Sequence, residues 1–492
     1  MDTTATGSGD AQDLQPALDR RTLIKLVSAS GLALAAGHAG AAVSGERHRY
    51  AIVGNGSRAR MYLEALTGKY KDHHSLVAVC DTNPGRAAYF VKLATEAGVP
   101  APRAYAAADF DKMLREAQIQ TVIVTTPDAT HDEYLVRALD AGCHAITEKP
   151  MTTTPEKAQR VLDACKRNGR HVRVNFNYRY SPVRSQVKEL LLNNEIGDIL
   201  SVDFHWLLNT QHGADYFRRW HSQKAMSGGL MVHKATHHFD LVNWWLGAQP
   251  ERVLAYGKRE FYTPATAKRM GLSSHHERCR TCPEKAECSF QLDLAADPRL
   301  KALYLDNEHY DGYFRDRCVF RPDIDIEDTM NVIVRYDTGA TLSYSLNACN
   351  AWEGYQIAFN GTKGRLEHQI VEQVYVAGGN MTQGASQEGG TTVRLIPLRG
   401  AVKDIEPRQA EGGHGGGDAA MLEDIFGTPP EDKLRRASDE RSGAYSILIG
   451  AAANRCFQTG ETVRIADLVT GLTPPSNAPM PTRSSPIPMP RV

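Results

Sequence analysis

A glycine-rich turn early in the chain is the clearest place where chemistry can be inferred from residue types and spacing. The turn follows the apolar, partly β-branched run 48–53 and consists of Gly54, Asn55, Gly56, Ser57, Arg58 and Ala59. The first glycine permits a tight turn, the second lets the backbone approach a pyrophosphate, and the small Ala59 permits close packing of a following helix. This pattern is typical of a nicotinamide dinucleotide site.

Asp81 closes a second strand-like run, 75–80, about 20 residues beyond the glycine turn, which is the usual position of a ribose-binding carboxylate. A carboxylate there accepts a hydrogen bond from the ribose 2′-hydroxyl and repels a 2′-phosphate. We therefore expect NAD as the cofactor, although the nearby Arg86 leaves room for NADP. The alternative is that Asp81 is a simple turn residue.

Three residues further along have the spacing of a metal-chelating set. His233, His237 and Asp240 stand at i, i+4 and i+7, which places all three on one face of a predicted helix. Two imidazoles one turn apart suit zinc or a similar divalent ion, and His212 or His414 could complete the coordination shell. The alternative is that His233 orients another group by hydrogen bonding or packs between domains.

A group of cysteines lies in the same half of the chain, at Cys279, Cys282, Cys288 and Cys318. Four thiolates suit a tetrahedral structural zinc site or an iron–sulfur centre. In an exported protein they could instead form disulfides, with three pairings available, or remain free thiols. In each case we expect the cluster to hold together an insertion at residues 262–320, away from catalysis.

Two further segments carry side chains that could line a ligand cleft. His212, Tyr216, Arg219 and Trp220 mix aromatic rings with hydrogen-bonding groups, as sugar-binding sites do, although an ordinary aromatic-rich loop has the same composition. His414 lies in the glycine-dense run 412–418, where the glycines either permit close approach of the backbone to a ligand or form a hinge. We take these residues as candidates for substrate contacts.

The elements that must position these residues alternate between strand-like and helical segments. The apolar runs 121–125 and 143–147 follow the two strand-like runs before them, with helical segments between. Such alternation predicts the parallel, doubly wound sheet of a Rossmann domain over residues 48–174. Ligands of these sheets lie at the carboxyl ends of the strands, so the turns Thr126-Pro127 and Glu148-Lys149-Pro150 are expected to face the cofactor crevice.

Taken together, these motifs resemble the glucose-fructose oxidoreductase / inositol dehydrogenase / MocA family. The match covers residues 48–247 and is carried by the glycine turn with Arg58, the Thr126-Pro127 turn with His131, the Glu148-Lys149-Pro150 turn and the run Asn177-x-Arg179-Tyr180. The resemblance implies a dinucleotide site made of Gly54, Asn55, Gly56, Ser57, Arg58, Asp81, Arg86, Thr126, Pro127, His131, Glu148, Lys149 and Asn177, with Arg179 and Tyr180 toward the substrate. It also implies an α/β protein whose second domain, residues 175–455, has an open, mostly antiparallel sheet that closes the nicotinamide pocket.

The resemblance also points to catalytic residues. Lys149 matches the family's lysine, and His237, after Gly228-Gly229, matches the family's histidine, while His233 stands where the family usually has aspartate. In these roles Lys149 stabilises negative charge on the substrate oxygen, and His237 takes the hydroxyl proton as hydride leaves carbon. His233 is then an orienting residue or a metal ligand.

Composition and the two ends of the chain limit the partners and the location. The 57 basic residues balance 57 acidic ones, so there is no electrostatic case for nucleic acid as a partner.

Residues 1–42 have the order of a twin-arginine export signal, with Arg20 and Arg21 before an apolar stretch; an amphipathic helix with two arginines is the alternative. We expect a periplasmic or secreted protein with no membrane contact after signal removal, because no later apolar run reaches the roughly 20 residues that span a bilayer. Residues 456–492 form a C-terminal segment with a proline-rich tail.

The predicted function is that of an NAD-dependent oxidoreductase, working as a homo-oligomer on a hydroxyl group of a small carbohydrate: a sugar, a polyol or a glycoside. One alternative is a glycosidase that holds NAD tightly, oxidises the sugar transiently, eliminates the glycosidic group and adds water. That route suits an exported enzyme, which has little free NAD to recycle. The other alternative is a catalytically silent sugar sensor that contains NAD.

Overall fold

Six strands near the N-terminal end of the described chain form one parallel sheet in the order β3-β2-β1-β4-β5-β6. The strands are β1 (His48–Val53), β2 (His74–Asp81), β3 (Arg103–Ala106), β4 (Thr121–Val124), β5 (His144–Glu148) and β6 (Val172–Asn175). The strand order reverses between β1 and β4, so the carboxyl ends of these two strands frame a crevice. The predicted doubly wound parallel sheet is confirmed.

Helices cover both faces of this sheet because alternate strand residues point to opposite sides. Ile52 packs in an apolar cluster with residues of α2 and α3, whereas Ala51 and Val53 pack in a cluster with residues of α5 and α6. The helices are α2 (Ala59–Thr67), α3 (Pro84–Glu96), α4 (Phe110–Glu116), α5 (His131–Asp140) and α6 (Pro155–Asn168), with short 3₁₀ turns η1 (Ala107–Asp109) and η2 (Asp128–Thr130). The glycine turn therefore lies between β1 and α2, as its motif requires.

The computed structural model describes residues 47–372, 375–376, 380–381, 390–410 and 415–481. Residues from His48 onward form one compact unit, so the two sheets of the chain share a continuous core. The predicted export signal and the end of the proline-rich tail lie outside the described residues, as does His414.

The second sheet has nine strands in the order β16-β15-β12-β11-β7-β10-β9-β8-β17, and its neighbours are antiparallel except for the parallel pair β7 and β10. Buried and exposed residues alternate along β9, as expected of a sheet with one covered face. The expected open, mostly antiparallel sheet is confirmed. The strands are β7 (Ile199–Asn209), β8 (Pro250–Lys258), β9 (Thr329–Tyr336), β10 (Thr341–Asn350), β11 (Glu353–Gly361), β12 (Gly364–Glu372), β15 (Thr392–Pro397), β16 (Lys403–Ile405) and β17 (Val463–Arg464), beside a small pair β13 (Tyr375–Val376) and β14 (Asn380–Met381).

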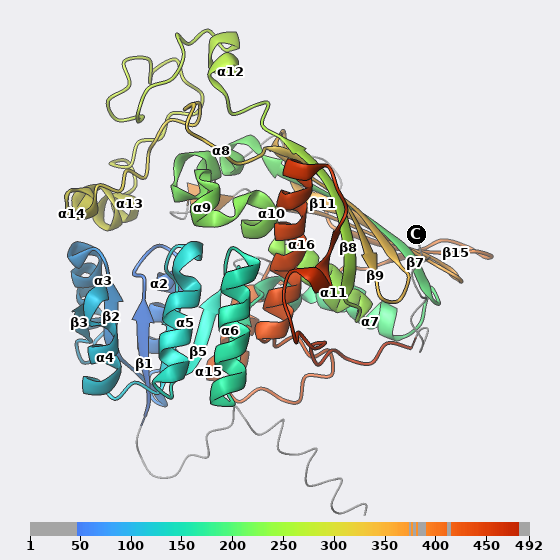
Figure 1. Cartoon of the computed structure of the whole chain (residues 1–492), viewed down its shortest axis with the longest axis horizontal. Helices are drawn as coiled ribbons and strands as arrows, with labels where there is room; N and C mark the ends of the chain where they lie inside the picture. Colours follow the sequence, from blue (N-terminus) through green and yellow to red (C-terminus); the bar gives the residue numbers. More distant parts are fainter. Residues whose placement is uncertain (1–46, 373–374, 377–379, 382–389, 411–414, 482–492) are drawn as a thin grey trace, which may run out of the picture. The chain divides into compact units, whose positions relative to one another are not determined.

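The helices and 3₁₀ turns of the second part are η3 (Asn177–Tyr180), α7 (Pro182–Leu192), α8 (Thr210–Arg218), η4 (Trp220–Ser222), α9 (Lys224–Ser227), α10 (Gly229–His233), α11 (Thr236–Leu246), α15 (Gly417–Phe426), α16 (Glu440–Thr459) and η6 (Ile465–Asp467). Of these, α10 and α16 lie between the two sheets in Figure 1. The predicted domain end at residue 455 falls inside α16, because this helix keeps a buried face until it ends at Gly460. After it, β17 joins the edge of the second sheet, so the C-terminal segment takes part in the fold.

An insertion of residues 259–328 separates β8 from β9. It carries α12 (Pro264–Arg269), α13 (Pro298–Leu303), η5 (Leu305–Asn307) and α14 (Glu308–Asp311). In Figure 1, α13 and α14 lie next to α3 of the parallel sheet. The buried side chain of Leu303 belongs to the same apolar cluster as residues of α2 and α3, so the insertion packs directly on the Rossmann part.

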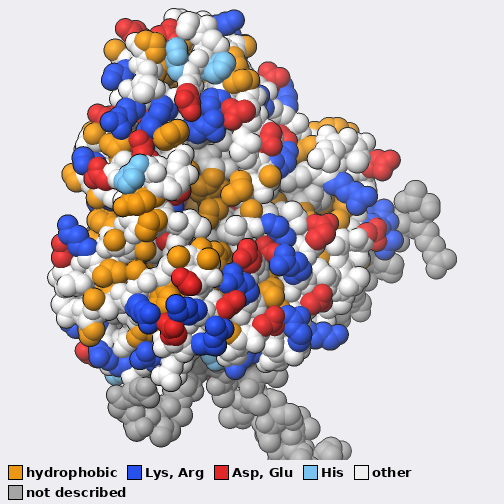
Figure 2. All heavy atoms as spheres, turned by 60° about the vertical axis from the view of Figure 1, so that its left-hand side comes forward, with side chains coloured by type: hydrophobic (Ala, Val, Ile, Leu, Met, Phe, Trp, Pro, Cys, Tyr) orange, Lys and Arg blue, Asp and Glu red, His pale blue; other side chains and the backbone are white. Residues whose placement is uncertain are grey.

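The face of the molecule in Figure 2 carries basic and acidic side chains interspersed, without a broad patch of one sign. This agrees with the balanced composition. Among the helices that the structure describes, none combines the length and the apolar character needed to traverse a bilayer.

Candidate active site

The glycine turn lies at the point where the sheet order reverses, and its geometry requires glycine at its first position. Gly54 has a φ of +85°, and an added Cβ would lie 2.6 Å from the backbone nitrogen of Thr126. The ends of β1 and β4 therefore approach so closely that no side chain fits between them. This brings the turn and the Thr126-Pro127 segment to one crevice, as the two motifs together predicted.

Asp81 ends β2 beside this turn and is buried. One of its oxygens accepts a hydrogen bond from the backbone N–H of Asn55 at 2.5 Å, and the other accepts one from the backbone N–H of Asn83 at 2.7 Å. Arg86 also donates to it, at 3.1 Å. The Asp81 carboxylate therefore holds the backbone of the glycine turn by a hydrogen bond, and it also binds the Arg86 side chain.

Asn55 gives an independent sign that the turn holds a polar ligand. Its side chain is fully buried, yet its amide oxygen and nitrogen have no hydrogen-bond partner among the described residues. Leaving a buried amide unsatisfied costs about 1–3 kcal/mol, so such groups in native proteins usually await a ligand or a water molecule. The turn, its backbone N–H groups and this amide fit a dinucleotide, which Asn55 and Asp81 would hold.

Other predicted cofactor residues form hydrogen bonds that connect the segments around the crevice. Arg58 donates to Glu148 at 2.9 Å and to Asp418 of α15 at 3.1 Å. Asn177 donates to the same Asp418 oxygen at 2.7 Å. His131 is buried with its ring nitrogens 2.8 Å and 2.9 Å from the backbone oxygens of Pro150 and Thr126, so it joins the two turns. The Asp418 contact was not predicted, although the glycine-dense run before it indicated a close approach.

A buried chain of three side chains forms the centre of the candidate site. Asp128 follows Pro127 at the carboxyl end of β4, and its Oδ2 lies 2.5 Å from Nδ1 of His233. On the other side of the ring, Nζ of Lys149 lies 3.4 Å from Nε2 of His233 and donates to the His233 backbone oxygen at 3.1 Å. Three segments distant in sequence thus converge on one imidazole.

Burial sets the protonation of this chain. It lowers the pKa of Lys149 to about 8, against the opposing effect of Asp128 and Glu148. Burial likewise lowers the pKa of His233 well below its usual value, helped by the cation of Lys149. It raises the pKa of Asp128, while Lys149 and Arg219 favour the anion. Of the three groups, Lys149 has its pKa displaced toward neutrality, which suits a group that exchanges protons near physiological pH.

Aromatic side chains from the predicted ligand segment surround His233. The rings of Tyr216, Trp220 and His221 lie with centroids 5.3 Å, 5.9 Å and 4.2 Å from it. His212 joins this wall through its Nε2, 3.1 Å from the Tyr216 hydroxyl. Aromatic faces with hydrogen-bonding edges are what a sugar ring and its hydroxyl groups contact.

The remaining polar groups of this wall form a second chain behind the first. Glu353 of β11 lies 2.8 Å from Nδ1 of His212. Arg219 pairs with Asp215 at 2.8 Å and lies over the Tyr216 ring. The structure therefore gathers His212, Tyr216, Arg219 and Trp220 in one region, beside carboxylates that the sequence analysis did not single out. Their contact with a substrate stays a prediction.

His237 lies in the first turn of α11, and its ring is stacked on Tyr178 with centroids 4.3 Å apart. Phe176 touches the ring from the edge. The side chain is buried, so it faces the interior between η3 and α11. Its role in catalysis remains a prediction, because these contacts neither require nor exclude proton transfer.

The predicted chelating set is not brought together, because the helix that should carry it is broken. α10 ends at His233 and α11 begins at Thr236, so the expected single face does not exist. The oxygen of His233 accepts from Lys149, and the N–H of His237 bonds to Lys234 instead. The side chain of Asp240 pairs with Arg179 at 2.5 Å, with both nearly fully buried.

Two predicted substrate residues also have internal roles. The Arg179 guanidinium is occupied by Asp240 through two hydrogen bonds. The Tyr180 hydroxyl donates to Asp424 at 2.6 Å and accepts from Arg173. Both side chains are buried, so they fasten η3 to α11 and α15 and are not available to a substrate.

The four cysteines of the insertion lie near one another as thiols. None of them forms a disulfide. Burial raises the pKa of Cys282, followed by the effects of Cys318, Cys279 and Cys288, while a hydrogen bond from the Glu284 backbone opposes the rise. Cys279 also accepts from Arg218 at 3.3 Å. The predicted cluster thus exists in space, but its sulfurs are not gathered as closely as metal ligands.

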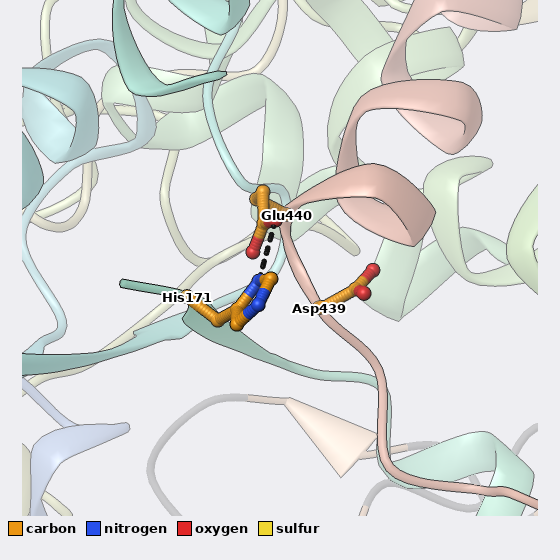
Figure 3. Close-up of side chains that lie close together, drawn as sticks. All are labelled: His171, Asp439 and Glu440. Atoms are coloured by element: carbon orange, nitrogen blue, oxygen red, sulfur yellow. Dashed lines mark hydrogen bonds and ion pairs between the residues drawn. The ribbon is translucent and has the colours of Figure 1, made fainter. Parts of the chain in front are cut away.

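Among the described residues, one group of three potential ligands has its atoms within 4.8 Å of one another: His171, Asp439 and Glu440 (Figure 3). Asp439 caps α16 by accepting from the N–H groups of Arg441 and Ser442, and Glu440 accepts from His171 at 2.9 Å. The start of a helix favours anions and disfavours a cation. The two carboxylates therefore serve the helix, and we assign no metal to them.

Sequence reasoning missed several residues of the site, above all Asp128. One signal could have found it, because Asp128 directly follows the Thr126-Pro127 turn at the carboxyl end of a central strand. Glu353 carried no such signal, since only packing brings it to His212. Thr130, directly before α5, does not cap this helix with its side chain, but donates to the Pro127 oxygen at 2.8 Å and lies 2.9 Å from the Thr126 hydroxyl.

Comparisons with known proteins agree with this fold. A family model described as an oxidoreductase family's NAD-binding Rossmann fold matches residues 48–176, and one described as that family's C-terminal alpha/beta domain matches residues 188–465. YteT of Bacillus subtilis is 39% identical over 428 residues, which cover 84% of this chain and 97% of YteT.

Solved structures of low sequence identity share the fold. The aldose-aldose oxidoreductase of Caulobacter crescentus, solved with glycerol, has a TM-score of 0.55 at 18% identity, covering 85% of this chain and 100% of its own. The WlbA dehydrogenase of Bordetella pertussis, solved with NADH and UDP-GlcNAcA, has a TM-score of 0.55 at 19% identity, covering 85% of this chain and 99% of its own.

Proposed function

Because this chain belongs to the glucose-fructose oxidoreductase / inositol dehydrogenase / MocA family of oxidoreductases, we propose that it binds NAD and transfers hydride to or from a carbon bearing a hydroxyl group of a sugar or polyol. The observation that carries the proposal is the buried chain Asp128, His233 and Lys149. Lys149 follows Glu148, which pairs with Arg58 of the glycine turn. A proton-exchanging group therefore stands beside the predicted dinucleotide site.

The dinucleotide would be held by the N–H groups of the glycine turn, the Asn55 amide and the Asp81 carboxylate. Gly54 permits the close backbone approach that a pyrophosphate needs. When bound, the nicotinamide supplies a ring carbon that accepts or returns hydride. Every other step depends on side chains of this chain.

Lys149 is proposed to exchange the hydroxyl proton. Its neutral amine accepts the proton during oxidation, and its ammonium form returns it during reduction. Asp128 accepts from Nδ1 of His233, which leaves Nε2 of the ring as an acceptor for a Lys149 N–H. The His233 imidazole thus orients the Lys149 amine by accepting a hydrogen bond from it. His237 is the second candidate for this role.

The substrate class is inferred from the wall around His233. Tyr216 and Trp220 place aromatic rings beside His233, and His212 and Arg219 add polar groups next to them. The structural neighbour from Caulobacter crescentus is named for aldoses, and the one from Bordetella pertussis was solved with UDP-GlcNAcA. A sugar or polyol therefore fits this site better than a flat apolar substrate.

The test begins with purification without added cofactor, followed by denaturation and quantification of released nicotinamide. Titration calorimetry with NAD and NADP then measures binding, and free aldoses, polyols and aryl glycosides are screened side by side. Appearance of NADH with a free sugar or polyol supports the proposal. Release of an aglycone without net NADH would identify the redox-neutral glycosidase alternative. Folded protein that holds and binds neither dinucleotide contradicts the proposal.

A matched pair of variants tests the chemistry. Lys149→Met is expected to lower kcat about 100-fold or more while NAD still binds, because it removes the proton acceptor but leaves the glycine turn, Asn55 and Asp81 in place. Lys157→Met is the control, since Lys157 is a partly exposed lysine that contacts Ala129 and Asp132. A Lys149→Met enzyme with unchanged kcat would transfer the role to His237.

A further inference from the structure

The insertion between β8 and β9 reaches the glycine turn itself, far from its own strands. The hydroxyl oxygen of Tyr304 accepts from the backbone N–H of Ser57 at 3.1 Å and lies 2.9 Å from the Ser57 hydroxyl. It is also the nearest atom, at 3.6 Å, to a Cβ added at Gly56. A side chain from the insertion thus stands at the atoms where a pyrophosphate is expected.

The next residues of the insertion cover the start of α3, beside the ribose-binding carboxylate. The backbone oxygen of Asn307 accepts from the Asn83 side chain at 2.9 Å. A Cβ added at Gly85 would lie 2.0 Å from Asn307 Oδ1 and 2.8 Å from the ring of Tyr310. Gly85 has ordinary backbone angles and opens a helix, where alanine is normally better. The close approach of the insertion therefore explains this glycine.

A carboxylate of the insertion completes the contact. Asp311 accepts from Arg86 at 2.6 Å, and the same guanidinium group donates to Asp81 at 3.1 Å. The Arg86 side chain is only 12% exposed. Arg86 is the cation that a 2′-phosphate would need at this position, and here two carboxylates already occupy it.

We propose that residues 297–313 of the insertion form the outer wall of the dinucleotide site, where Tyr304 retains the cofactor and Asp311 selects NAD against NADP. This inference rests on the proposed function, since it concerns the same dinucleotide. The wall is anchored at its far end, because Arg278 beside Cys279 pairs with Glu308 of α14 at 2.8 Å and with Asp316 at 2.7 Å. Cofactor exchange then requires the wall to move.

Selection by Asp311 is tested by a competition that does not depend on turnover. The purified protein is incubated with equal concentrations of NAD and NADP and desalted, and the bound dinucleotides are released and quantified by chromatography. Asp311→Asn is expected to raise the ratio of bound NADP to NAD about tenfold, because it frees Arg86 for a phosphate. The Asp311→Asn, Arg86→Met double variant should lose this gain.

The matched control for this charge is Asp306→Asn. Asp306 lies in the same insertion, but its ion-pair partner is Lys301, at 2.7 Å, and both side chains are about half exposed. The ratio of bound NADP to NAD in the Asp306→Asn variant should equal the wild-type ratio. An Asp311→Asn ratio equal to the wild-type ratio, in protein that still carries NAD, would overturn the selection by Asp311 and leave the proposed function intact. Wild-type protein that takes up neither dinucleotide would instead contradict the proposed function.

Retention by Tyr304 is tested by the rate at which NADH fluorescence falls when bound NADH is displaced by excess NAD. Tyr304→Phe is expected to speed release about threefold to tenfold, the effect of one lost hydrogen bond. Tyr256→Phe is the matched control, because Tyr256 of β8 is exposed and lies outside residues 297–313. Equal release rates in the two variants would overturn the role of Tyr304.

Discussion

The buried imidazole of His233 is oriented by hydrogen bonds to two partners. His233 stands between Asp128 and Lys149, and each partner comes from the end of a different strand of the parallel sheet. The carboxylate fixes which ring nitrogen carries hydrogen, and the lysine meets the other nitrogen. Where the family resemblance led us to expect aspartate, this chain therefore places a histidine and supplies the aspartate from elsewhere.

The pH dependence of catalysis follows from the lowered pKa of Lys149. A lysine is neutral above its pKa, and burial brings this pKa to about 8. Sugar oxidation needs the neutral amine, so kcat/KM for oxidation should rise as the pH increases through about 8 and then level off. The measurement is an initial-rate profile from pH 6 to pH 10. A profile that falls across this range would contradict the role of Lys149.

Asp128 is expected to act as a positioning residue. Asp128→Asn keeps the size of the side chain but removes its charge, so the His233 ring loses its fixed hydrogen. We expect kcat to fall at least about 10-fold and the pH profile to shift, with NAD affinity within about twofold of the wild type. Asp140→Asn, at an exposed pair with Arg167, is the control. An unchanged pH profile in Asp128→Asn would leave Asp128 a purely structural role.

At the scale of elements, two contacts decide how the helices sit around the site. The buried pair Arg179 and Asp240 fastens η3 to α11. Arg58 and Asn177 both donate to Asp418 at the start of α15, where Gly417 leaves space for the Asn177 backbone oxygen. Polar side chains that looked like ligand contacts in the sequence thus hold elements in place.

The Arg179 and Asp240 pair should matter for stability. Asp240→Asn leaves a guanidinium buried without its countercharge, which typically costs about 3–5 kcal/mol. Urea unfolding followed by circular dichroism measures the free energy of unfolding. Glu189→Gln removes the partner of Arg408 in an exposed pair and should barely change it. Equal unfolding free energies in the two variants would show that the buried pair contributes nothing.

The cysteine cluster is expected to bind about one zinc ion per chain, with all four thiols as ligands. Metal binding would draw the sulfurs together and tighten the insertion, since Cys279 is next to Arg278, the anchor of α14. Inductively coupled plasma mass spectrometry measures the metal, and Cys282→Ser should lose it and lower the melting temperature. Cys349→Ser, a cysteine of β10 outside the cluster, is the control. Disulfides found among these four cysteines by peptide mapping would contradict the expectation.

The whole molecule joins a parallel sheet to an antiparallel one through α16, which touches β6 and α6 of the first and β8 of the second. The insertion makes a second connection, from the strands of the antiparallel sheet to the glycine turn. The two parts are therefore joined at two separate places. The homo-oligomeric state stays a prediction that light scattering can measure.

Export is the prediction that concerns the entire chain. If residues 1–42 are a twin-arginine signal, the protein expressed in a bacterium with that export route should be found outside the cytoplasm. Replacing Arg20 and Arg21 together with lysine should retain it in the cytoplasm, because the route recognises the arginine pair. Cell fractionation and immunoblotting measure the distribution, with Arg47→Lys as the control. An unchanged distribution in the double variant would contradict the export prediction.

Local sequence alone determined the elements of the Rossmann part and the glycine turn. Gly54 and Asp81 could be placed because a tight turn, a strand and a carboxylate at its end are each set by neighbouring residues. Tertiary structure decided which partners those residues meet: Asp128 with His233, Arg179 with Asp240, and Tyr304 with Ser57. These pairs are far apart in sequence, and hydrogen bonds between them depend on how elements pack. The predicted helix through His233, His237 and Asp240 failed for the same reason. The spacing of these residues is regular, but in the structure the His233 carbonyl accepts a hydrogen bond from Lys149, which is distant in sequence.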